Sequence, residues 1–129
     1  MQRPDAAYTL AITFLYYKDL QRAMQFYGDI LGLSLAIDQG WSKIYRICEG
    51  AHVGLVDESK GMNRWTSQKP VQLCIRVPDV DSWYCYAVEN DLPELSQVFQ
   101  NDQLGIRAFV FRDPEGYQIE MQSALREGA

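Results

Sequence analysis

The 129-residue sequence predicts an α+β protein built from two βαβββ modules. An apolar strand, a capped helical stretch and three strand-like segments occur in this order twice, about sixty residues apart. The hydrophobic content of 47% is that of an ordinary globular chain. Two modules of about 60 residues each bury too little surface alone, so we expect them to share one core.

The expected organisation is a single domain over residues 1–129. Module one covers about residues 8–58 and module two about residues 70–125. The segment between them, about residues 59–69, contains polar residues and a glycine and reads as a linker.

Leu10–Tyr17 opens module one as a strand, because its residues are mostly apolar, β-branched or aromatic. Asp19 can cap the helix that follows, and Gly32 can end it. The apolar residues of this helix have helical spacing: Leu20, Met24, Tyr27 and Leu31. Three strand-like segments complete the module: Ser34–Asp38, Ser42–Cys48 and His52–Asp57.

Module two repeats this outline. Val71–Val77 is the opening strand, and Asp79 is the matching helix cap. The helical stripe after the cap consists of Val80, Tyr84, Ala87 and Val88. The remaining strands are expected at roughly Leu95–Phe99, Ile106–Arg112 and Tyr117–Ser123.

The last strand follows a tight turn, Asp113-Pro114-Glu115-Gly116. Proline presets φ in such a turn, and glycine takes the positive φ that closes it. Beyond the turn, apolar and polar residues alternate, so one strand face is apolar and the other is polar. Glu120 lies on the polar face, where a carboxylate is a natural metal ligand or acid–base group.

Charge and cysteine usage exclude several classes of partner. A net charge of −5 argues against nucleic acid, which is bound by basic residues that neutralise phosphates. No apolar run reaches the ~20 residues of a membrane span, and no basic amphipathic stretch or signal peptide is visible. The three cysteines have no metal-type spacing: Cys48, Cys74 and Cys85. We expect a cytoplasmic protein that binds neither nucleic acid nor membrane.

Two motifs together resemble the vicinal oxygen chelate superfamily. The first is Asp19-Leu20-x-x-Ala23-x-x-Phe26-Tyr27-x-x-x-Leu31-Gly32, and the second is Asp113-Pro114-x-Gly116-x-x-Ile119-Glu120. The superfamily includes glyoxalases, extradiol dioxygenases, fosfomycin-resistance enzymes and bleomycin resistance proteins. The resemblance covers about residues 10–123. It implies a curved, eight-stranded mixed sheet that forms a cup with helices outside, and a homodimer.

The resemblance also implies four positions for ligands of a divalent metal ion. Counted from the helix caps, they fall on Ile12, near Gly54, on Gln72 and on Glu120. An apolar side chain and a glycine cannot ligate, so two of the four ligands are missing and no metal or other cofactor is expected. A displaced site of Gln72, Glu120 and His52, the chain's one histidine, is the alternative.

Glu120 has two further interpretations. In an apolar cup, burial would raise its pKa and make it a general base. If Arg76 shares the cup, the two side chains would pair and the carboxylate would stay ionised. Gln72 and Cys74 alternate onto the same strand face as Arg76, so all three are candidate ligand-binding residues.

The cup would have aromatic and aliphatic walls with a few polar anchors. The arginines could hold a carboxylate or phosphate, and the rings could stack on a planar group. Phe and Tyr on alternating strands are most often plain core residues, which is the alternative for each of these aromatics. Either Tyr45 or Arg46 faces the interior. The candidate wall residues are Ile12, Phe14, Tyr16, Trp41, Tyr45, Arg107, Phe109 and Phe111.

Three functions follow as hypotheses. The favoured one is metal-free binding of a small organic ligand, similar to the way bleomycin resistance proteins sequester theirs. The second is a metal-dependent lyase, isomerase or dioxygenase with an altered ligand set, such as a lactoylglutathione lyase-like or dioxygenase-like member. The third is metal-free acid–base catalysis by Glu120.

Overall fold

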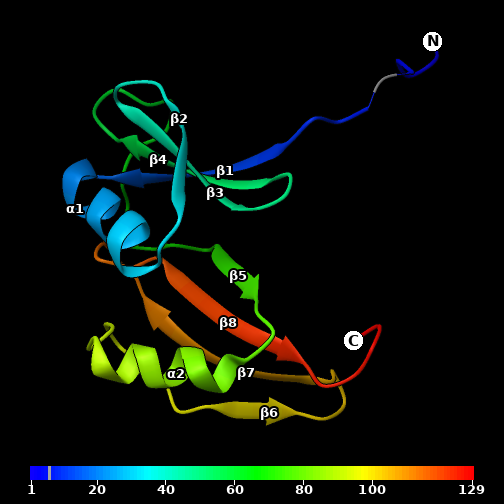
Figure 1. Cartoon of the computed structure of the whole chain (residues 1–129). Coiled ribbons are helices and arrows are strands. Elements are labelled where there is room, and N and C mark those ends of the chain that lie inside the picture. Colours follow the sequence, from blue (N-terminus) through cyan, green and yellow to red (C-terminus); the bar gives the residue numbers. More distant parts are fainter. Residues whose placement is uncertain (6) are drawn as a thin grey trace. The chain divides into compact units, whose positions relative to one another are not determined.

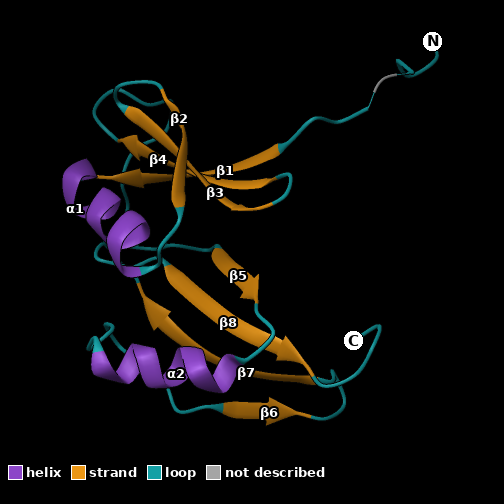
Figure 2. Cartoon of the chain, viewed as in Figure 1, coloured by secondary structure: helices purple, strands orange, loops and turns teal. Residues whose placement is uncertain are grey.

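The structure is a computed structural model that describes residues 1–5 and 7–129 (Figure 1). The chain forms two compact units, Met1–Trp65 and Thr66–Ala129. Each unit has the element order βαβββ and contains one four-stranded mixed sheet (Figure 2). The predicted α+β fold of two repeated modules is therefore confirmed. No helix in the described part of the chain is long and apolar enough to cross a membrane.

Module one has the sheet order β1-β4-β3-β2. Strands β1 and β4 are parallel, whereas β4–β3 and β3–β2 are antiparallel. The elements of this module are β1 (Ala11–Tyr17), α1 (Leu20–Gln25), the π-helical turn η1 (Phe26–Ile30), β2 (Ser34–Asp38), β3 (Ser42–Cys48) and β4 (Ala51–Asp57).

The helix of module one begins where the sequence predicts it. The Asp19 side chain accepts a hydrogen bond from the Arg22 backbone N–H at 3.0 Å, which caps the first turn. The single predicted helix instead changes to π-helix at Phe26. The Tyr45 ring packs beside Gly28, where an added Cβ would lie 3.4 Å from it, an ordinary contact distance.

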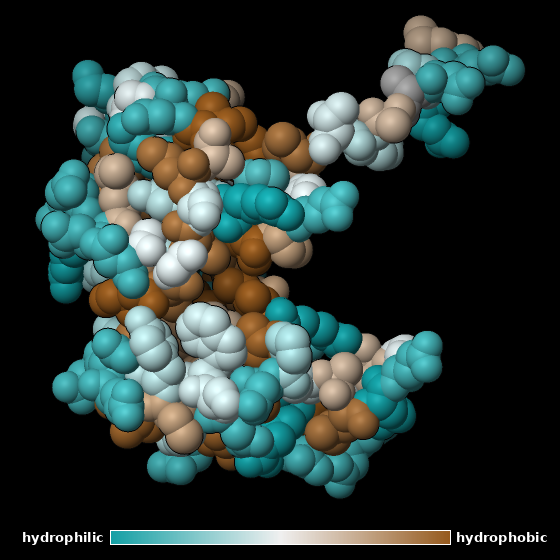
Figure 3. Space-filling view, viewed as in Figure 1, coloured by the Kyte–Doolittle hydropathy of each residue, from teal (hydrophilic) through white to brown (hydrophobic). Residues whose placement is uncertain are grey.

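The helix packs one side on the sheet and leaves the other to solvent. Phe26 and Tyr27 are buried, and the Tyr17 hydroxyl of β1 donates a hydrogen bond to the Tyr27 hydroxyl at 3.1 Å. Hydrophilic residues cover the visible outer side of α1 in Figure 3, in agreement with the exposure of Gln21 and Gln25. Module one is thus one sheet with an amphipathic helix on one face.

Module two has the sheet order β5-β8-β7-β6, with β5 parallel to β8 and the other neighbours antiparallel. Its helix is capped by Asp79, whose side chain accepts from the Ser82 backbone N–H at 3.2 Å. Its elements are β5 (Gln72–Arg76), α2 (Val80–Glu89), β6 (Phe99–Asn101), β7 (Ile106–Arg112) and β8 (Gln118–Ala124).

The second strand of module two lies later than predicted. The structure has β6 at Phe99–Asn101, whereas the sequence predicted roughly Leu95–Phe99. The Ser96 backbone N–H donates to the Val110 carbonyl at 2.9 Å, but the Ser96 hydroxyl, not its carbonyl, accepts from the Val110 N–H. This side-chain bond replaces one bond of a regular ladder, so the segment approaches β7 without forming a strand.

The turn before β8 has the predicted chemistry. Gly116 has φ of 98°, and the buried Asp113 carboxylate accepts from the backbone N–H groups of Glu115 and Tyr117 at 2.9 and 3.0 Å. The Asp113 N–H donates to the Tyr117 carbonyl at 2.8 Å. These bonds fix where β8 starts and therefore which of its residues share a face.

Candidate functional site

Each sheet has a helix face, which packs against its own helix, and an opposite open face. Side chains alternate between the two faces along a strand, and directly paired residues share a face. In module two, the Tyr84 ring of α2 contacts the Phe109 ring with a centroid separation of 5.3 Å. Phe109 pairs with Met121, so both lie on the helix face. Glu120, one position away, lies on the open face.

The open face of module two carries the polar residues that the sequence singled out. The parallel β5–β8 register pairs Cys74 with Glu120, and the antiparallel β7–β8 register pairs Glu120 with Val110. Because side chains alternate, the same face continues with the pairs two positions to each side along β5 and β8. Its polar members are Gln72, Cys74, Arg76, Gln118, Glu120 and Gln122.

Four hydrogen bonds join this face into one network. Gln118 Nε2 donates to Gln72 Oε1 at 2.6 Å, and Gln72 Nε2 donates to Glu120 Oε1 at 3.5 Å. Gln122 Nε2 donates to the other carboxylate oxygen, Glu120 Oε2, at 2.5 Å. Arg76 Nε in turn donates to Gln122 Oε1 at 2.7 Å. The carboxylate is therefore held by amide groups on both sides.

The direct Arg76–Glu120 pair, one of the alternatives from the sequence, does not form. The register places Arg76 opposite Gln122 instead, and Gln122 is 7% exposed. This amide connects the guanidinium to the carboxylate by one hydrogen bond on each side. Arg76 also donates from Nη1 to the carbonyl of Ala129.

Cys74 lies beside the carboxylate on this face. Partial burial raises the pKa of the Cys74 thiol, and the negative charge of Glu120 raises it further. A thiol with a raised pKa is mostly protonated at neutral pH and is a poor nucleophile. Cys74 is therefore suited to packing or weak hydrogen bonding on the open face.

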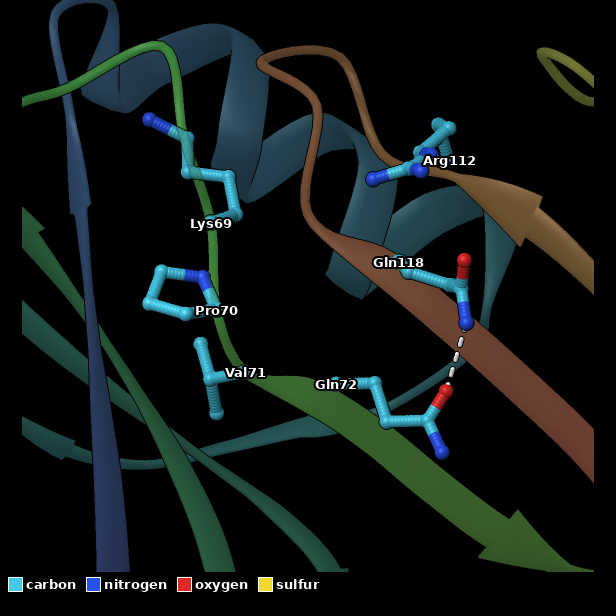
Figure 4. Close-up of a pocket in the computed structure, with 6 residues that line it drawn as sticks. All are labelled: Lys69, Pro70, Val71, Gln72, Arg112 and Gln118. Atoms are coloured by element: carbon cyan, nitrogen blue, oxygen red, sulfur yellow. Dashed lines mark hydrogen bonds between the residues drawn. The ribbon is translucent and has the colours of Figure 1, made fainter.

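A pocket of about 260 Å³ lies at the start of β5 and β8 (Figure 4). Figure 4 shows Gln72 and Gln118 on these adjacent strands, joined by their hydrogen bond. Arg112 Nη1 donates to the Gly116 carbonyl at 2.9 Å, which uses one of its five N–H donors. The pocket is lined by Lys69, Pro70, Val71, Gln72, Arg112 and Gln118. We call it the cationic pocket.

The open face of module one is apolar where the superfamily resemblance places metal ligands. The register pairs Ile12 with His52 and Phe14 with Gly54. A Cβ at Gly54 would lie 2.4 Å from Phe14 Cδ1 and 3.2 Å from Ile12 Cγ2. The Phe14 ring therefore occupies the space that any side chain at position 54 would need.

A second pocket, of about 120 Å³, lies on the open face of module one. Three of the predicted ligand-binding residues meet here, because Phe14 and Tyr16 alternate on β1 and Trp41 precedes β3. We call it the aromatic pocket. Its walls consist of Phe14, Tyr16, Gln39, Trp41, Ser42, Val56, Gly61 and Met62.

Four predicted wall residues lie on helix faces instead. Phe109 and Phe111 are each 1% exposed and stack on one another with ring centroids 6.0 Å apart, below α2. Arg107 shares their face and forms a bidentate ion pair with Asp81 of α2, with Nη2 2.9 Å from Oδ1 and Nε 3.2 Å from Oδ2. These three residues form part of the packing between β7 and α2.

Tyr45 is the fourth. Its ring packs against Gly28 of η1 and is 5% exposed. Burial and the nearby Asp29 carboxylate raise the pKa of its hydroxyl. The sequence left Tyr45 and Arg46 as alternatives, and the register now places Arg46 on the open face, opposite His52.

Several residues of the two pockets and of the hydrogen-bond network around Glu120 were not singled out from the sequence. The alternation of β8 already placed Gln118 and Gln122 on the face of Glu120, which was a usable signal. Lys69 lay in the expected linker, and Arg112 ended a strand whose other face was the one predicted to line the cup. No feature of the sequence around Ser42 indicated that its side chain would line a pocket.

The donor set does not fit the metal ion of the superfamily. Ile12 and Gly54 have no donor atom, while Gln72 and Glu120 are hydrogen-bonded to each other. Within residues 1–5 and 7–129 there is no group of three or more His, Cys, Asp or Glu residues that could hold an ion. His52 Nδ1 is buried without a hydrogen-bond partner, but its paired neighbours, Ile12 and Arg46, offer no second ligand. Transition-metal sites usually need three or more such donors.

Comparison with known proteins agrees with the fold and motifs. The family model of the Glyoxalase/Bleomycin resistance protein/Dioxygenase superfamily matches residues 9–121. The chain therefore belongs to this superfamily. A search of the curated proteins finds no significant match.

Solved structures resemble the chain at low identity. A lactoylglutathione lyase from Agrobacterium tumefaciens is 22% identical with a TM-score of 0.73, over 99% of this chain and 100% of that one. A glyoxalase/bleomycin resistance protein/dioxygenase from Alicyclobacillus acidocaldarius is 20% identical with a TM-score of 0.68, over 98% and 97%. TioX from Micromonospora sp. ML1 is 20% identical with a TM-score of 0.70, over 90% and 98%. These likenesses show the fold and leave the activity to be argued from the site.

Proposed function

We propose that this protein binds a small organic anion on the open face of module two, without a divalent metal ion. The observation that carries the proposal is the cationic pocket, where Lys69 and Arg112 lie with the amides of Gln72 and Gln118. Lys69, whose Nζ donates to the Thr66 carbonyl, and Arg112 bring two positive charges beside two amides, and no carboxylate lines the pocket.

The charge of the pocket stands out against that of the chain. The net charge of the chain is −5, whereas the lining of this pocket contains two basic residues and no acidic one. The pocket therefore attracts anions locally, although the protein as a whole is acidic. Arg112 keeps further N–H donors after its bond to Gly116, and a guanidinium can bind a carboxylate in bidentate geometry. Val71 and Pro70 add an apolar wall for the organic part of the ligand.

The experiment compares benzoate with its neutral counterpart, benzyl alcohol, in the presence of EDTA. Isothermal titration should show benzoate bound at least about tenfold more tightly than the alcohol. Arg112→Gln and Lys69→Gln should each weaken benzoate binding. Arg107→Gln is the matched control, because this arginine lies on the helix face and is paired with Asp81. Equal binding of acid and alcohol, or a loss in the control alone, would refute the proposal.

Catalysis by Glu120 is tested on the same proteins. The carboxylate lies beside the pocket through its bond to Gln72, so it could act as a base on a bound molecule. If the protein catalyses proton exchange or isomerisation in the presence of EDTA, and Glu120→Gln does not, then it is an enzyme that works without a metal ion. Activity that EDTA abolishes would instead support a metal-dependent lyase, isomerase or dioxygenase and contradict metal-free binding.

We also propose that the protein is a cytoplasmic homodimer. In the described residues, β1 and β5 each pair with one neighbouring strand only, which leaves an edge with unpaired backbone groups. Such an edge is a template for pairing with another strand, including one of a second copy. Light scattering at micromolar concentration should give twice the chain mass of 14.8 kDa. A monomeric mass over the whole concentration range would contradict this part.

A further inference from the structure

We propose that the aromatic pocket of module one is a second binding site, which takes an uncharged planar ring bearing a hydroxyl or carbonyl group. The ring would stack on aromatic side chains, and its polar group would hydrogen-bond to the hydroxyl of Ser42. This site goes beyond the proposed anion binding and does not depend on it, because no residue of the cationic pocket contributes to its walls.

The walls of the pocket offer ring faces. Phe14 is 42% exposed and Trp41 is 45% exposed, although side chains of this size are usually more buried. Aromatic side chains of this kind favour offset-stacked or edge-to-face contacts with another ring. A volume of about 120 Å³ suits a single six-membered ring, since an apolar cavity of about 150 Å³ holds benzene.

Ser42 supplies the second, independent observation. Its residue is 3% exposed, and its Oγ atom is buried without a hydrogen-bond partner in the structure. The register pairs Ser42 with Val56, another residue of the pocket, so the Ser42 side chain lies on the open face. A buried hydroxyl without a partner is unfavourable, and a ligand with an acceptor or donor would satisfy it.

The charge of the lining selects for a neutral ligand. None of the residues of the pocket carries a charge. Lys43, the basic residue next to Ser42 in the sequence, is already paired with Asp38 at 2.7 Å. An anion placed here would lack a counter-charge after losing its hydration. A phenol, or an uncharged ring with a carbonyl group, fits the lining.

The experiment measures phenol and toluene, two rings of equal size that differ in one hydroxyl group, by saturation-transfer NMR titration. Wild-type protein should bind phenol about tenfold more tightly than toluene. In Ser42→Ala this preference should fall to about twofold or less, with toluene binding unchanged. Trp41→Ala should weaken both rings, whereas Trp83→Ala, a change of tryptophan on α2, should weaken neither.

A preference for phenol that persists in Ser42→Ala, or equal binding of both rings to the wild type, would overturn the proposal. Circular dichroism melts of each variant show whether it folds, and the exposed Trp41 provides a second variant that does not disturb the buried strand. Benzoate serves to separate the two sites. If phenol does not bind while benzoate does, this inference fails alone. If Arg112→Gln abolishes benzoate binding and leaves phenol bound, both sites are supported as distinct.

Discussion

Substitution of Gly54 by alanine should destabilise the protein, because Phe14 fills the space beside this glycine. The added Cβ would lie 2.4 and 2.6 Å from two Phe14 ring atoms, well inside ordinary contact distance. Overpacking of this kind costs about 1–3 kcal/mol. Gly54 does not have a positive φ, so alanine also lowers the entropy of the unfolded chain and returns about 0.4–1 kcal/mol. The expected net loss is about 1–2 kcal/mol.

Urea denaturation followed by circular dichroism measures this loss as a lower midpoint with an unchanged m value. The double variant Gly54→Ala/Phe14→Ala should recover stability relative to the sum of the single changes, because the clash is removed. Gly28→Ala is the matched control, since its Cβ would meet Tyr45 at an ordinary 3.4 Å. Unchanged or increased stability of Gly54→Ala, or the absence of coupling to Phe14, would refute the claim that a ring occupies the ligand position.

Three further predictions follow from the packing and from the pKa shifts. Phe109→Ala should lower the unfolding free energy by about 3–5 kcal/mol, measured by urea denaturation, because this ring is buried under α2. Hydrogen bonds from the side chain and backbone of Ser82 lower the pKa of Asp79, so its contribution to stability is present above the ordinary value of 3.8 and is lost as pH falls through the lower folded pKa. Asp79→Ala should therefore melt at a lower temperature at pH 6 and lose less stability on acidification; identical pH profiles would contradict this. Because Glu120 contributes to the raised pKa of Cys74, Glu120→Gln should speed alkylation of Cys74 by iodoacetamide at pH 8, with Cys85 as the internal reference; an unchanged ratio would count against the contact.

The repeat and most strand positions could be predicted from the sequence, because strand alternation and helix caps are local signals. Strands β3 and β7 have the predicted bounds, and both helices begin after the predicted aspartate caps. The position of β6 was not predictable, because the hydroxyl of Ser96 replaces a backbone acceptor there. The sequence predicted one continuous helix here and gave no signal for the change to π-helix at Phe26.

The faces of the strands were harder to assign. Alternation separates a strand into two sets of residues but does not say which set lies under the helix. The sequence placed Arg107, Phe109 and Phe111 on the wall of the cup, yet they lie on the helix face, where Arg107 pairs with Asp81 of α2. For β8 the apolar set was clear, and its pairing with β7 would have placed Phe109 beside Met121 on the helix face.

The open-face residues of module two were partly predictable. Gln72, Cys74 and Arg76 share the expected face, and Glu120 lies on the polar side of its strand. The replacement of a direct ion pair by the Gln122 amide depends on the register between β5 and β8, which a single sequence does not fix.

The aromatic pocket depends on tertiary structure even more. A Cβ at Gly61 would lie 2.6 Å from Val56 and 3.0 Å from Tyr16, so the segment after β4 folds back onto these side chains. Gly61 and Met62 of this segment form part of the pocket that Ser42 also lines. A lone serine at the start of a strand carries no periodic signal for such an arrangement.

Elemental analysis of protein purified without chelators tests the central claim most directly, because Ile12 and Gly54 offer no ligand atoms and Gln72 is bound to Glu120. We predict far less than one equivalent of manganese, iron, cobalt, nickel, copper or zinc per chain, and benzoate binding that EDTA does not change. One equivalent of a transition metal per chain, removed by chelator together with ligand binding, would contradict the account.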